Sequence, residues 1–168
     1  MLELTVQDGT TEVVLQFEHS LLSLSKWESK HKKAFMSTPV KDAGEMIEYF
    51  EAMLVGSYSP GVVYRLDPEQ LDEITNYINE PQTATHVPEE EPSKKFAAET
   101  VTSELIYYWM TALKINWAAE TWHLSRLMTL IQITNFKSQP EKKQSKGEAL
   151  SKWREANAAI KKKYGTNG

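Results

Sequence analysis

The chain has 168 residues and a net charge of −4, with 40% apolar and 25% charged residues. This length is enough for one domain with a hydrophobic core and a tail. The sequence has no cysteine, which excludes a disulfide framework, a thiol nucleophile and a zinc site built on thiolates. No apolar run approaches the roughly 20 residues that span a bilayer, so we expect no membrane-spanning segment.

The charge is divided unevenly along the chain. Residues 137–168 hold nine Lys or Arg and three Glu, a net charge of +6, whereas residues 1–136 hold ten basic and twenty acidic residues, a net charge of −10. A division of this size indicates two parts with different roles. We predict a hairpin plus helical domain at 1–136 and a basic amphipathic tail at 137–168.

The first predicted element is a β-hairpin. The pair Asp8-Gly9 is a strong turn signal because glycine accepts a positive φ. Because an isolated hairpin is marginally stable in water, its apolar face must pack on helices or on a partner. The apolar residues that alternate with polar ones on the two strands are Leu2, Leu4 and Val6 before the turn, and Val13, Leu15 and Phe17 after it.

Three predicted helices follow the hairpin, and each begins with a residue type that caps helices. Ser20, Asp42 and Asp67 can each accept a hydrogen bond from the first helical turn, and Glu45 and Gln70 stand at the third helical position of a capping box. The expected apolar stripes are Leu21, Leu24 and Trp27, with His31 as a further candidate; Met46, Ile47, Phe50, Met53 and Leu54; and Leu71, Ile74 and Ile78.

Residues 80–99 read as a loop rich in proline and glutamate, and two more helices are predicted after it. The first is capped by Thr102 or Thr100, and the second begins at Asn116 and runs from 117 to about 134. This second helix is apolar on more than one side, so it lies in the core or is covered by a partner; we favour the core. Its apolar residues are Leu124, Leu127, Met128 and Ile131 on one stripe, with Leu130 and Ile133 outside it.

A last amphipathic stretch spans 145–163, with its apolar side at Ala149, Leu150, Trp153, Ala156 and Ile160. Alone in water a helix of this length is marginal, so we expect it to dock on the body, on another copy or on a client. The predicted fold class is therefore mainly α, with an N-terminal β-hairpin packed on a bundle of about five helices and a basic C-terminal helical tail.

The sequence contains no recognisable catalytic, metal or nucleotide motif. The four histidines, His19, His31, His86 and His123, do not form a helical metal pair, and no glycine-rich phosphate loop is present. Glu104 and Glu120 stand near helix starts, where they suit the helix dipole, and the alternative is a buried acid with a raised pKa. We expect no catalytic residues, no metal ligands and no cofactor.

Aromatic residues concentrate in one region: Tyr107, Tyr108, Trp109, Trp117 and Trp122. Such residues are common in binding hot spots, but at helical spacing they are more often core, and we favour the core for this group. The basic tail suggests nucleic-acid binding, but the acidic body would repel DNA, so we favour docking of the tail on an acidic surface, either of the same chain or of a partner. The predicted protein-binding residues are Trp109, Trp117, Trp122, Met128, Trp153 and Ile160.

Three stretches together resemble small proteins from the structural gene cluster of long-tailed bacteriophages. They are residues 18–30 (EHSLLSLSKWESK), 102–110 (TSELIYYWM) and 122–127 (WHLSRL), and the resemblance covers roughly residues 13–135. Within that group the chain is most similar to tail assembly chaperones.

The resemblance implies a non-enzymatic assembly factor in the host cell cytoplasm. Such chaperones hold the long tape-measure protein soluble while tail-tube subunits polymerise around it, and many exist in a second form made by ribosomal frameshifting. The run Lys161-Lys162-Lys163 is compatible with an A-rich slippery site. The alternatives are a head–tail connector or tail completion protein that forms homo-oligomeric rings, and a nucleic-acid-binding regulator.

Overall fold

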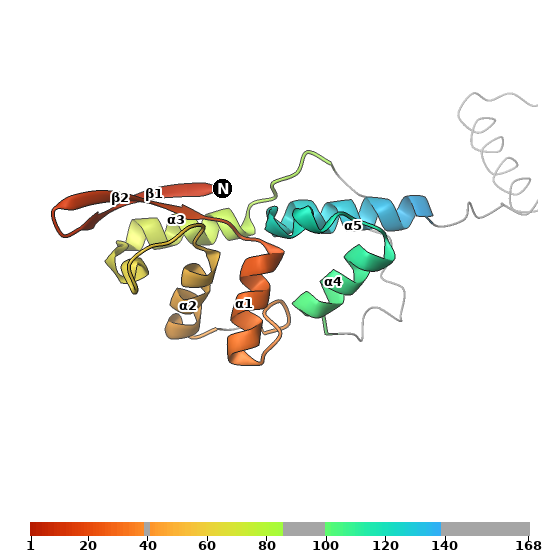
Figure 1. The fold of residues 1–168 in the computed structure, drawn as a ribbon, viewed down its shortest axis with the longest axis horizontal. Coiled ribbons are helices and arrows are strands. Elements are labelled where there is room, and N and C mark those ends of the chain that lie inside the picture. The colour runs from red at the N-terminus through yellow and green to blue at the C-terminus, as the bar shows by residue number, and fades with distance from the viewer. Residues whose placement is uncertain (39–40, 86–99, 139–168) are drawn as a thin grey trace, which may run out of the picture. The chain divides into compact units, whose positions relative to one another are not determined.

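The computed structural model describes residues 1–38, 41–85 and 100–138 (Figure 1). Within them an N-terminal hairpin precedes five α-helices, which confirms the predicted mainly α fold class. The division at residue 136 stays a prediction, and the predicted tail helix at 145–163 lies outside the described residues. The elements in chain order are β1 (Leu2–Asp8), β2 (Thr11–Phe17), α1 (Leu21–His31), α2 (Ala43–Met53), the 3₁₀ helix η1 (Val62–Arg65), α3 (Pro68–Asn79), α4 (Ser103–Ala112), the 3₁₀ helix η2 (Trp117–Thr121) and α5 (Leu124–Ser138).

Strands β1 and β2 form the predicted hairpin, and the apolar residues named on the two strands lie opposite one another. Leu4 lies opposite Leu15, and Gly9 takes the positive φ of 68° that the turn requires. Figure 1 shows the hairpin alongside α3, with α1 and α2 next to each other below it. Its apolar face joins the core of the unit formed by Met1–Asn135, where Leu4, Val6, Leu15 and Phe17 are buried.

Both edges of the hairpin are partly covered by other segments. On the β1 side, Gln70 Nε2 donates to the Thr5 carbonyl at 2.8 Å. On the β2 side, the Gln16 amide donates to the Tyr58 hydroxyl at 3.1 Å, and the Val55 amide donates to the Gln16 carbonyl at 2.9 Å. At these positions the backbone groups that would pair with an added strand are already in use.

The predicted helix starts are confirmed by their hydrogen bonds. Ser20 and Asp67 form complete capping boxes with the third residue of their helices. Asp42 accepts from the Glu45 amide at 2.7 Å, but the Glu45 side chain pairs with Lys33 rather than with the cap. Short-range hydrogen bonding thus sets where α1, α2 and α3 begin.

Helix α1 is central to the core, since it contacts α2, α4 and η2. Its predicted stripe of Leu21, Leu24 and Trp27 is buried. On α2 and α3 the deepest aromatic side chains are Tyr49 and Tyr77, which the predicted stripes omitted. A buried tyrosine needs a partner for its hydroxyl, and these two lie 2.6 Å from His19 Nδ1 and 2.7 Å from a Glu18 carboxylate oxygen.

The predicted continuous helix from 117 to 134 is wrong. The chain forms the short 3₁₀ helix η2, becomes extended at Trp122 with ψ of 159°, and only then begins α5 at Leu124. The Leu124 amide donates to the His19 carbonyl at 2.7 Å, and Ser20 and His123 form an isolated antiparallel bridge. A distant backbone segment therefore interrupts the helix.

Replacing Lys114 with glycine is expected to stabilise the protein. Lys114 follows α4 with a positive φ of 55°, in a Schellman motif where Ile115 donates to the Met110 carbonyl at 2.8 Å. Glycine occupies this conformation without the steric cost of a Cβ atom, so Lys114→Gly should add up to about 1 kcal/mol. Thermal unfolding followed by circular dichroism should show a Tm higher by about 2–4 °C.

The matched control is Ala112→Gly, two residues earlier at the last position of α4, where glycine costs up to about 1 kcal/mol relative to alanine. We expect this variant to melt below the parent protein. A lower Tm for Lys114→Gly as well would contradict the assignment of residue 114 to a left-handed cap.

Candidate protein-binding surface

The segment Asn116–Trp122, named here the η2 segment, exposes two tryptophans. Trp117 is 56% exposed and Trp122 is 38% exposed, although tryptophan is usually well covered in a folded domain. Five of the seven residues are exposed, and Glu120 is the segment's one charged residue. Helix α3, by contrast, exposes Glu69, Asp72 and Glu73. Aromatic enrichment with little charge is the composition of a protein interface.

Local hydrogen bonds fix the backbone of the η2 segment. The Asn116 side chain accepts from the Ala118 amide at 2.9 Å and begins the 3₁₀ helix. Ala119 is the buried residue of η2, on the element that contacts α1. The Trp122 amide donates to the Ala119 carbonyl at 3.1 Å. The segment is therefore anchored at its centre and at both ends.

Tyr107 of α4 supports the η2 segment from the side. Its hydroxyl donates to a Glu120 carboxylate oxygen at 2.8 Å, and its ring stacks on Trp117 with centroids 5.2 Å apart. Burial and the hydrogen bond to Glu120 raise the pKa of Tyr107, so it remains a donor at neutral pH. These contacts hold Trp117 in place before any partner arrives.

The positively charged side chain of Arg126 lies over the ring of Trp122. The Arg126 guanidinium carbon lies 4.8 Å from the ring centroid, within the range of a cation–π contact. The next residue, His123, is 5% exposed, so the chain passes from the surface into the core within one residue. The backbone at Trp122 is therefore held by the buried residue that follows it in the chain.

The structure separates the predicted binding residues into three groups. Trp117 and Trp122 are exposed together on the η2 segment, whereas Trp109 and Met128 are half-buried against the core. Trp153 and Ile160 lie outside the described residues, as does His86. The preference for a core location of the five clustered aromatic residues is wrong for Tyr108, Trp117 and Trp122, which are exposed. Trp117 and Trp122 do not lie on a regular α-helix, so helical spacing does not place them in the core, and Tyr108 lies on the exposed side of α4.

Among the residues that the structure describes, the buried acid is Glu28, which is not one of the two candidates from the sequence. Of the two predicted candidates, Glu104 is exposed and Glu120 is half-buried. Glu28 accepts a hydrogen bond from the Phe35 amide at 2.8 Å and another from the Ser103 amide at 2.7 Å. Its position seven residues after Leu21, on the apolar stripe of α1, was the signal available in the sequence.

No constellation in the described ranges resembles an active site. His123 and Ser125 lie 2.8 Å apart, but the Ser125 hydroxyl also accepts from the Gln82 amide. A pocket of about 400 Å³ beside α1 includes Ser20 and Ser23, whose hydroxyls are used in the helix cap. Among residues 1–38, 41–85 and 100–138, no group of three His, Asp or Glu side chains is arranged for a metal ion. None of the helices described is long and apolar enough to cross a membrane.

Comparison with family models, curated proteins and solved structures finds no match to this chain.

Proposed function

We propose that this protein is a non-enzymatic protein-binding assembly factor, and specifically a phage tail assembly chaperone that binds the tape-measure protein. The observation that carries the proposal is the exposure of Trp117 and Trp122 on a short, braced and almost uncharged segment. The likeness of residues 18–30, 102–110 and 122–127 to tail assembly chaperones supplies the specific partner. The same likeness supports the host cell cytoplasm as the place where the protein acts.

The bracing of the η2 segment favours binding. Association costs free energy when side chains must be immobilised, and this cost is smaller for side chains that are already held. Trp117 is stacked on Tyr107, Arg126 lies over the Trp122 ring, and the next residue in the chain, His123, is buried. A long helical client with an exposed apolar stripe offers complementary surface to such fixed aromatic rings.

The alternative is a virion component, such as a head–tail connector or a tail completion protein. Rings of copies joined by strand addition through the hairpin would need free strand edges. Because Thr5 and Gln16 already have partners on the outer edges of β1 and β2, the described structure favours the transient binder over this form of assembly.

The proposal is tested by quantitative mass spectrometry on infected-cell lysate and on purified particles, together with a pull-down of this protein. We expect abundance in lysate, absence from particles and recovery of the tape-measure protein. Truncating the two exposed tryptophans together, Trp117→Ala with Trp122→Ala, should lower that recovery at least tenfold, since hot-spot tryptophans contribute about 2 kcal/mol or more each. Stoichiometric presence in particles would overturn the chaperone proposal.

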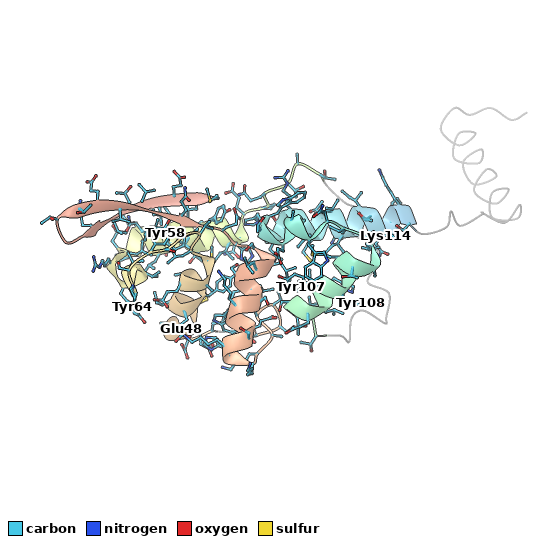
Figure 2. The ribbon with its side chains drawn as sticks, viewed as in Figure 1. Glu48, Tyr58, Tyr64, Tyr107, Tyr108 and Lys114 are labelled. Carbon is cyan, nitrogen blue, oxygen red and sulfur yellow. The ribbon has the colours of Figure 1, made fainter. Side chains whose placement is uncertain are left out.

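Tyr64→Ala is the matched control for the tryptophan variant. Tyr64 is 71% exposed on η1, and Figure 2 places it beside the hairpin end of the molecule, away from Tyr107 and Tyr108 on α4. This variant removes an exposed aromatic ring without touching the η2 segment. Recovery should stay within about twofold of the parent protein. Equal losses for both variants would show that binding does not depend on the η2 segment.

A further inference from the structure

His123 forms a closed set of hydrogen bonds that fixes its tautomer. Its Nε2 lies 3.1 Å from the Tyr77 carbonyl, which can only accept, so Nε2 carries the proton. Its Nδ1 accepts from the Ser125 amide at 3.3 Å and lies 2.8 Å from the Ser125 hydroxyl. That hydroxyl accepts from the Gln82 amide at 3.0 Å and donates its own proton to Nδ1. Every polar atom in the set is satisfied only while His123 is neutral.

These bonds join three segments that are distant in sequence. His123 contacts the end of α3 through Tyr77, and the neighbouring Leu124 amide donates to the His19 carbonyl at 2.7 Å, at the junction of β2 and α1. In the described part of the chain, the hydrogen bonds that join the start of α5 to other segments come from residues 123–125. The remaining attachment of α5 is apolar packing by Leu124, Leu127 and Ile131.

We propose that this junction is a pH-sensitive latch, which holds the start of α5 on the β2–α1 junction while His123 is neutral and releases it when His123 is protonated. A proton on Nδ1 would oppose the Ser125 amide proton and force the Ser125 hydroxyl to accept two bonds and donate none to His123. Because Trp122 directly precedes His123, release would also free one end of the η2 segment. The inference does not rest on the proposed function.

The charged and titratable groups around His123 determine the direction of the effect. Burial lowers the pKa of His123 below its ordinary value, and the amino group of Met1 acts in the same direction. The Tyr77 carbonyl and the carboxylates of Glu18 and Glu80 oppose this shift without reversing it. His19, whose ring centroid is 5.1 Å from that of His123, has a pKa lowered to about 3 by burial and by His123. Both rings therefore favour the closed junction at neutral pH.

Amide hydrogen exchange tests the latch in the full chain. The Leu124 amide should exchange faster than the hairpin amide of Leu15 at pH 7, because it opens locally. Between pH 7 and pH 5 its protection, corrected for intrinsic exchange, should fall more than about threefold, up to a limit of about 25-fold, because opening restores an ordinary histidine pKa near 6.5. In His123→Gln, whose carboxamide cannot titrate, the fall should be under about threefold.

Three results would overturn the latch. Equal protection of Leu124 and Leu15 would mean that only global unfolding exposes the junction. If the protection of Leu124 does not fall between pH 7 and pH 5 in the parent protein, His123 is not the titrating group. The same conclusion follows if the fall persists in His123→Gln. If His123→Gln does not fold, an NMR titration of His123 in the parent protein tests the latch instead. A His123 pKa at or above 6.5 would mean that protonation does not favour the open junction.

Discussion

Glu28→Ala is expected to lower the free energy of unfolding by about 3–5 kcal/mol. The Glu28 carboxylate is 6% exposed and accepts from two backbone amides, those of Phe35 and Ser103. Alanine would leave both amides buried without a partner, each at a cost of about 1–3 kcal/mol, and would leave space where the side chain was. Ser103 is the first residue of α4, so the variant also removes a negative charge from a helix N-terminus.

Urea unfolding followed by far-UV circular dichroism measures this loss. Glu28→Gln keeps one accepting oxygen and most of the volume, so it should cost less than the alanine variant. Glu73→Ala, which removes an exposed carboxylate from α3, should change stability by no more than about 0.5 kcal/mol. If Glu28→Ala is no more destabilising than Glu73→Ala, the two-amide bridge does not contribute to stability.

Trp27→Ala should destabilise the protein by a similar amount, about 3–5 kcal/mol. The Trp27 side chain is 1% exposed, and its indole nitrogen donates to the Glu45 carbonyl at 2.9 Å. Its ring stacks on His31 with centroids 4.3 Å apart and meets Phe35 edge-on at 5.2 Å. Truncation would open a cavity between α1, α2 and the residues that join them, and would remove the indole hydrogen bond to the Glu45 carbonyl.

Trp117→Ala is the natural control for this prediction, because it deletes the same side chain from an exposed position. Its unfolding free energy should stay within about 1 kcal/mol of the parent protein. Trp27→Phe should lie between the two, since it keeps an aromatic ring but loses the hydrogen bond to Glu45. Similar losses for Trp27→Ala and Trp117→Ala would contradict the burial described for Trp27.

The exposure of Trp117 and Trp122 is the feature of the candidate binding surface that the sequence did not predict. The sequence predicts Trp117 and Trp122 as binding residues, but the helical spacing of the same region favours the core. One continuous helix would have placed them by helical spacing alone. The break at Trp122 changes their environment, and it depends on the hydrogen bond between Leu124 and the distant His19 carbonyl. Whether these residues bind a partner stays a prediction.

Local sequence patterns were sufficient to predict the hairpin and the starts of α1, α2 and α3. Those features depend on alternation of apolar residues, on Gly9 at the turn and on caps whose partner stands three residues away, such as Ser20 and Asp67. The burial of Glu28 and the break in the chain before α5, in contrast, follow from tertiary contacts. Both outcomes depend on backbone groups from remote segments, and local sequence patterns carry no information on which remote group will be close.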